Sequence, residues 1–263
     1  MADEHPKITL ASPNATTPLT EFAQQVPAFI DGIKKLGTAI ARSLTTLYEH
    51  VTTGELIEKA GWLPHYTSPF DQITLDDDPS AVHDLLGSHY RENWDAVKAQ
   101  FLTKLATYDV DGEAKETFTE ALELHELGHY RAVVRLLFPE IERVARIELY
   151  EGKLNIASLK ELREAAGKNL GLSSFGSTRY SFNLYRRVSE HLYEYVTSPE
   201  SIERYTNDPV PNRHASLHGV VIYKNVNNSL NAIIMAEMML ALISDLKDLI
   251  SNDDAENETA EES

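Results

Sequence analysis

Apolar residues recur at three- and four-residue steps along most of this chain, the spacing that places them on one face of an α-helix. Segments rich in glycine, proline and serine separate these stretches, at 61–79 and 168–180. Only 220–223 has the character of a brief extended piece. The pattern therefore predicts an all-α fold, an antiparallel helical bundle. The expected helices are 19–60, 80–87, 89–108, 113–150 with an interruption at Pro139, 158–166, 182–196, and a short one from Ser198-Pro199-Glu200.

The most apolar of the predicted helices is the last one. Asn228 or Ser229 is expected to cap its start, and it should continue to about Ile250. Apolar residues surround much of its girth, so we expect it to be buried inside the bundle or at a dimer interface.

The connector at 61–79 carries two aromatic residues beside prolines, Trp62 and Tyr66. Such residues more often cover a core from a loop than form a surface site. We therefore expect Trp62 and Tyr66 to pack onto the core.

Composition narrows the class of protein further. Hydrophobic residues make up 42% of the 263 residues, which is ample for a core, and the chain has no cysteine. The missing cysteines exclude disulfides, thiolate zinc sites and cysteine nucleophiles, and they fit a reducing cytoplasm. Neither a leader nor a stretch of ~18 apolar residues is evident, so we expect a soluble, cytoplasmic protein without membrane contact.

The formal charge of -17 argues against non-specific binding of duplex nucleic acid, which requires a broad basic face. About a third of this excess comes from the last eleven residues, 253–263, which contain six acids and no base. A nuclease with a small cleft needs only a few arginines near that cleft to bind RNA. The negative net charge is therefore compatible with selective or transient binding of RNA.

The candidate catalytic residues lie in the segment 209–219. Two prolines there precede the start of a helix, which Asn212 or Asp208 can cap. Arg213 and His218 stand five residues apart, and Gly219 allows the helix to stop behind the histidine. Two long side chains at this spacing can converge on one small group. A fixed cation beside a group that titrates near neutral pH suits a phosphate that must be bound and attacked.

The run from Arg213 to His218 resembles the R-x-x-x-x-H motif of the HEPN superfamily, in which the residue after the arginine is usually polar. The segment from Tyr223 into the last apolar helix is similar to the ending of prokaryotic HEPN proteins of the abortive-infection and toxin type. Residues 128–131 and 138–143 resemble the helix that packs beside the motif helix in the same proteins.

This resemblance implies a metal-independent endoribonuclease, a toxin or phage-defence effector, that needs no cofactor. The ribose 2′-hydroxyl would attack the adjacent phosphorus and leave a 2′,3′-cyclic phosphate. His218 would be the general acid or base, and Arg213 would hold the phosphate. Asn212 and His214 are candidates to position the phosphate or the leaving oxygen.

Two further expectations follow from the resemblance. Glu142 would orient Arg213 or His218, and Arg146 would add positive field. HEPN nucleases dimerise so that two motif helices form a composite cleft, so a homodimer is expected, with RNA as substrate and an antitoxin or defence protein as a possible partner.

The resemblance also suggests a division of the chain. We expect a mobile N-terminus over 1–18, an N-terminal helical extension over 19–109, and a HEPN-like bundle over 110–251. An acidic disordered tail would complete the chain at 252–263.

A second motif competes with the first. The run from His125 to His129 matches H-E-x-x-H, in which two histidines on one helix face bind zinc and Glu126 acts as general base. The extended form of the motif fails, because Arg135 stands where a third histidine would be. Two alternatives to the nuclease therefore stay open: a non-catalytic helical interaction module of a defence or toxin–antitoxin system, and a zinc hydrolase at His125 and His129.

Overall fold

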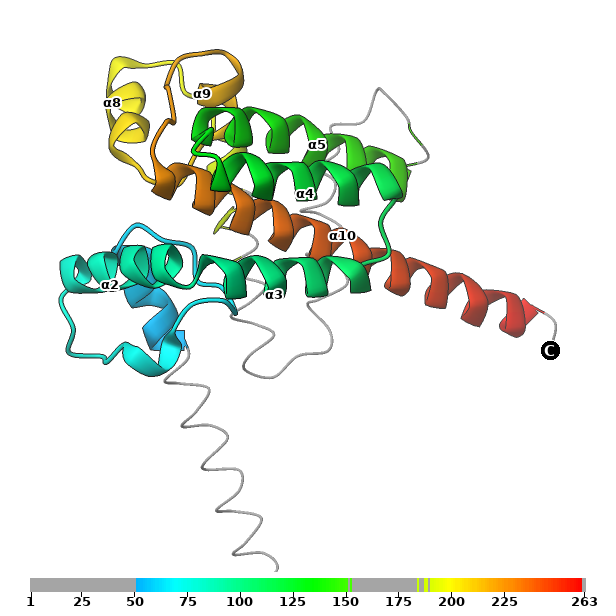
Figure 1. Ribbon diagram of the computed structural model, residues 1–263. Coiled ribbons are helices and arrows are strands. Elements are labelled where there is room, and N and C mark those ends of the chain that lie inside the picture. Colours follow the sequence, from blue (N-terminus) through cyan, green and yellow to red (C-terminus); the bar gives the residue numbers. More distant parts are fainter. Residues whose placement is uncertain (1–50, 151, 153–183, 185–186, 189, 262–263) are drawn as a thin grey trace, which may run out of the picture. The chain divides into compact units, whose positions relative to one another are not determined.

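The computed structural model describes residues 51–150, 152, 184, 187, 188 and 190–261, all of which belong to one compact unit (Figure 1). Within these residues the secondary structure is helical and contains no strand. The predicted all-α class is confirmed. The elements are η1 (Phe70–Gln72), α2 (Pro79–Glu92), α3 (Trp94–Thr107), α4 (Gly112–Glu126), α5 (Tyr130–Tyr150), α8 (Pro199–Asn207), α9 (Arg213–Leu217) and α10 (Val226–Glu261).

Helix α10 is the core of this unit, and α3, α4 and α5 pack against it (Figure 1). Ile233, Ile234, Met239 and Ile243 have no exposed surface. The prediction of a buried last helix is confirmed, with its own bundle as the partner. Nearly every side chain over 228–244 is buried, so this part of α10 removes a large apolar area from water.

The segment Val226–Lys247 is long and apolar enough to cross a membrane, which the sequence analysis did not expect of any stretch. In this protein, however, 89% of that segment's apolar window is buried among the other helices. A core helix of a soluble protein has this character.

Polar side chains fix the starts of several helices. Asp78 accepts a hydrogen bond from the backbone N–H of Ser80 at α2, and Asp111 accepts one from Ala114 at α4. The predicted start of α8 is confirmed, because the Ser198 hydroxyl accepts from the N–H of Ser201. Each bond satisfies a donor that the first helical turn leaves free.

Asn225, and not the predicted Asn228 or Ser229, holds the start of α10. Its side chain accepts from the N–H of Asn228 at 2.8 Å, while the Asn228 side chain accepts from the N–H of Asn225 at 3.4 Å. This reciprocal pair caps the helix at Asn225, three residues before the first cap that the sequence indicated, and the helix starts at Val226.

The break expected at Gly87 and Ser88 is wrong. Helix α2 continues through both residues and ends at Glu92, with Asn93 before α3. A Cβ on Gly87 would lie 3.9 Å from the Trp62 ring, which is an ordinary van der Waals contact. Gly87 therefore faces this ring within a continuous helix and does not end it.

The interruption expected at Pro139 is also wrong, because α5 passes through this residue. The break falls instead at Gly128, whose φ of 78° is left-handed. Two hydrogen bonds close the end of α4, from Gly128 N–H to His125 C=O and from His129 N–H to Leu124 C=O. This is a Schellman motif. Pro139 is exposed, so the helical carbonyl that it leaves unpaired faces solvent and costs little.

The buried residues form one core, which contains side chains from Ile57 to Leu246. The division expected between 109 and 110 falls inside this core, so the described residues on both sides of it pack together. Trp62 is buried, while Tyr66 is 43% exposed and its ring lies over Phe101. The predictions for 1–50, 158–166, 168–180 and the final two residues fall outside the described residues.

Candidate functional site

Helix α9 is a single turn that carries Arg213 as its first residue and is followed directly by His218 as its C-cap. A second Schellman motif ends it: Gly219 has φ 70°, and the N–H of Val220 donates to Ala215 C=O at 2.9 Å. A helix this short has little dipole, so the binding of an anion here depends on side chains.

Asn212 fixes the other end of α9 from a fully buried position. Its Oδ1 accepts from the N–H of Ala215 at 2.8 Å, while its Nδ2 donates to the carbonyls of His191 and Glu194 at 2.6 and 3.0 Å. The substrate-binding role predicted for Asn212 is not compatible with a buried side chain whose donors are both used. Asn212 instead ties α9 to the segment before α8.

The structure brings Arg213 and Glu142 together. Nε of Arg213 lies 2.6 Å from Oε1 of Glu142, on α5, without the alignment of a hydrogen bond, so the contact is an ion pair. No hydrogen bond to the two Nη groups is present among the described residues. Because the Arg213 side chain is 28% exposed, these two groups can reach a ligand at the surface.

Two more side chains lie around this ion pair. Arg146 stands one helical turn beyond Glu142, and its Nε is buried without a hydrogen-bond partner in the described part of the chain. The Tyr193 ring lies 6.0 Å from the Arg213 guanidinium carbon. Its hydroxyl is buried and likewise without a partner there. Burial, together with the Glu142 charge, raises the pKa of Tyr193, so the phenol stays protonated and can donate.

The histidines of the motif lie side by side, with 4.6 Å between the ring centroids of His214 and His218. The backbone N–H of Val196 donates to Nδ1 of His214 at 3.3 Å. Burial lowers the pKa of His214, and the neighbouring His218 and Arg213 lower it further. His214 is therefore neutral at pH 7 and carries its proton on Nε2, as a hydrogen-bond donor. His218 is exposed.

The H-E-x-x-H segment does not have the geometry that a zinc site requires. Helix α4 ends at Glu126, so His125 and His129 do not share one helix face. His125 is buried, with Nδ1 2.8 Å from the Ser229 hydroxyl, whereas His129 is exposed. Glu126 pairs with Lys98 at 2.6 Å. A search of the described residues for three clustered metal-binding side chains finds none.

Sequence reasoning placed Arg213, His214, His218 and Glu142 in one site. The structure pairs Arg213 with Glu142 and places the ring of His214 beside that of His218. It missed Tyr193 and Val196, which no local pattern marks, because the fold alone brings them to α9. Helix α9 and its C-cap thus carry a cation, a neutral imidazole donor and an exposed imidazole. The chain matches no protein-family model, no curated protein and no solved structure.

Proposed function

We propose that this protein is a metal-independent endoribonuclease in which Arg213 and His218 act on one phosphodiester. The observation that carries the proposal is their placement at the two ends of the single turn α9, whose ends Asn212 and Gly219 fix. The resemblance of this run to the R-x-x-x-x-H motif of HEPN nucleases supports the same reaction.

In the proposed reaction the ribose 2′-oxygen attacks the adjacent phosphorus as the 5′-oxygen leaves. The products are a 2′,3′-cyclic phosphate and a 5′-hydroxyl. His218 is exposed at the surface and transfers the proton, since imidazole is the side chain best suited to do so near neutral pH. The free Nη groups of Arg213 bind the non-bridging oxygens and stabilise their developing charge.

His214 supports this chemistry as a donor. Its lowered pKa keeps the ring neutral, and the Val196 contact places the proton on Nε2. A neutral N–H beside His218 can hold a phosphate oxygen without competing for the transferred proton. Glu142 orients Arg213, and Arg146 adds positive charge one turn away.

We further propose that the protein acts in the cytoplasm as a homodimer with two such sites, as a toxin or defence effector controlled by a partner protein. The absence of cysteine is consistent with a reducing compartment. The exposed apolar residues Leu217 and Ile222 lie beside His218 and provide surface for a second copy.

The proposal predicts that purified protein cleaves RNA, that the reaction persists in EDTA, and that its products carry 2′,3′-cyclic phosphate and 5′-hydroxyl ends. An RNA with 2′-deoxyribose at the cleaved position should resist. Arg213→Ala and His218→Ala should each lower the rate by about 10²- to 10⁴-fold.

Arg204→Ala is a matched control for Arg213→Ala, because Arg204 is an exposed arginine on α8 that pairs only with Glu194 in the described structure. It should cleave RNA as the wild type does. RNA that stays intact with the folded wild type would contradict the nuclease proposal and favour the non-catalytic interaction module. Cleavage that EDTA abolishes would contradict the metal-independent mechanism.

A further inference from the structure

Two adjoining hollows lie at the start of α5, and Tyr130 lines both of them. One has a volume of about 490 Å³ and is basic, and the other has a volume of about 210 Å³ and is aromatic. Their combined size is typical of small-molecule sites, which measure about 300–1,000 Å³.

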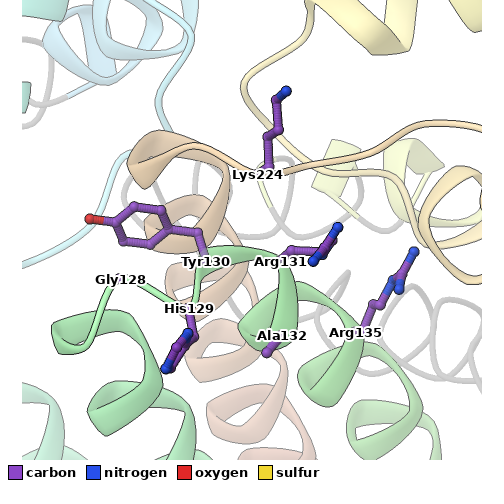
Figure 2. Close-up of a pocket in the computed structure, with 7 residues that line it drawn as sticks. All are labelled: Gly128, His129, Tyr130, Arg131, Ala132, Arg135 and Lys224. Atoms are coloured by element: carbon purple, nitrogen blue, oxygen red, sulfur yellow. The ribbon is translucent and has the colours of Figure 1, made fainter.

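The basic hollow is lined by Arg131 and Arg135 of α5 and by Lys224 of the segment before α10 (Figure 2). Figure 2 shows both arginines extending to the same side of α5. None of the three has an ion-pair partner among the described residues, and no described acid lines the hollow. In a chain with a formal charge of -17, three uncompensated cations at one position favour an anion such as a phosphate.

The aromatic hollow is lined by five aromatic side chains, together with charged residues that include Arg91 and Glu126. Trp62, Tyr90 and His125 are buried, so the partly exposed rings of Trp94 and Tyr130 are the ones that a ligand can reach. Figure 2 shows the Tyr130 ring extending to the side opposite Arg131 and Arg135, and Tyr130 also lines the aromatic hollow. Flat aromatic faces bind nucleobases by stacking.

Hydrogen-bonding groups are also present at the aromatic hollow. The indole N–H of Trp94 is buried and has no acceptor within the described residues, although nearly every buried donor in a protein has one. Asn227 uses its Nδ2 toward His83, which leaves its carbonyl oxygen able to accept. The edge of a base carries the matching acceptors and donors.

We infer that the two hollows form one binding site for a nucleoside phosphate. The base lies against Trp94 and Tyr130, and the phosphate lies among Arg131, Arg135 and Lys224. The inference holds whether or not Arg213 and His218 cleave RNA.

Such a nucleoside phosphate has two sources, a free nucleotide or a residue of an RNA strand. Arg135 and Glu142 lie seven residues apart on the same side of α5, about 10 Å along the helix axis. A strand held at Arg213, which pairs with Glu142, therefore extends to the basic hollow over a few nucleotides. This second source rests on the proposed function, and the first does not.

Calorimetric titration of the full chain tests the inference. The probes are the four 5′-mononucleotides, the matching nucleosides, inorganic phosphate, and a short oligoribonucleotide offered to the His218→Ala protein, which retains Arg213, so that it stays intact. We expect at least one nucleotide or the oligoribonucleotide to bind, and the corresponding nucleoside to bind at least tenfold more weakly. Binding of a mononucleotide identifies a free nucleotide as the source, and binding of the oligoribonucleotide alone identifies RNA.

Variants separate the two halves of the site. Arg131→Gln with Arg135→Gln, two exposed positions, should weaken binding of the nucleotide at least tenfold, whereas the matched Arg204→Gln should not. Trp94→Phe should weaken binding of nucleotide but not of inorganic phosphate. Trp62 and Trp94 are the only tryptophans of the chain, and both line the aromatic hollow, so their fluorescence reports the same titration.

Two results would overturn the inference. One is the absence of binding of every mononucleotide and of the oligoribonucleotide at millimolar concentration to protein that unfolds cooperatively. The other is binding that Arg131→Gln with Arg135→Gln leaves unchanged.

Discussion

His125 is buried, whereas the other histidines near α9 and α5 are exposed or partly exposed to solvent. It is 7% exposed, the Trp94 ring lies 4.4 Å away, and burial lowers its pKa to about 4. Its nearest polar contact is the Ser229 hydroxyl. The imidazole is therefore neutral in the folded protein over the whole physiological pH range.

This difference makes stability depend on pH. In the unfolded chain His125 takes up a proton near pH 6.5, but in the folded protein it does so only near pH 4. Stability should therefore fall as the pH drops from about 6.5 to about 4, by at most about 3 kcal/mol from this residue. Urea unfolding at several pH values should show a flatter profile for His125→Asn than for the wild type.

His129→Asn is the matched control, since His129 is exposed four residues further along. It should keep the wild-type dependence on pH. A profile for His125→Asn that is as steep as that of the wild type would show that another group carries the dependence.

At the scale of elements, the turns that end helices decide where the chain changes direction. The helical segment over 51–59 ends in the same motif as α4 and α9, with Trp62 N–H donating to Ile57 C=O at 3.1 Å and Gly61 at φ 82°. Gly61 and Gly128 thus have the same backbone conformation. They differ in what lies beside them.

Alanine substitutions at Gly61 and Gly128 distinguish the cost of backbone strain from the cost of a steric clash. Alanine at Gly128 meets open space, so it should cost only the left-handed conformation, about 1 kcal/mol. Alanine at Gly61 would place its Cβ 2.6 Å from Cγ of Pro209, so the loss should be about 1–3 kcal/mol larger. Denaturant unfolding of the two variants measures the difference, and equal losses would show that Pro209 moves aside freely.

Sequence patterns predicted the existence of these helices better than their ends. Gly87 and Pro139 are residues that usually interrupt helices, yet both lie within one. Gly87 faces the Trp62 ring, and Pro139 is exposed, so the helix accommodates both residues at these positions. Neither fact is visible in the local sequence. The true break at Gly128 depends on a positive φ that only the closing hydrogen bonds reveal.

At the scale of the whole molecule, a buried carboxylate joins three separate parts of the chain. Glu237 of α10 is 2% exposed and lies 3.0 Å from Nε2 of His65, which belongs to the connector after Trp62. It also accepts from the hydroxyl of Tyr108, at the end of α3. Removal of one partner from such a buried group is strongly destabilising, because the group that remains has lost its compensating contact.

Removal of the carboxylate should therefore be costly. Glu237→Ala should lower the free energy of unfolding by about 3–5 kcal/mol, because it leaves the buried His65 and the partly buried Tyr108 without this partner. Glu237→Gln retains the shape and one acceptor oxygen, so its loss should be smaller. Denaturant unfolding of both variants measures this order, and a loss below about 1 kcal/mol for alanine would contradict the role of the network.

The candidate site shows the same limit of sequence reasoning at this scale. The spacing of Arg213 and His218 is local, so the sequence marks it. The resemblance supplied Glu142 as a partner for Arg213. Tyr193 and the two adjoining hollows depend on contacts between residues that are far apart in the chain, and no local pattern indicates them.

The position of α10 in the chain also affects when the core can form during synthesis and folding. The bonds of its Glu237 to Tyr108 and His65 span 129 and 172 positions, and all of its described partner helices are synthesised before it. Contacts between distant residues form slowly, because a long loop must first close. Until α10 emerges, the apolar faces of α3, α4 and α5 lack the surface that covers them, which exposes the growing chain to aggregation. Synthesis of the final core helix is thus the step that allows the whole site to form.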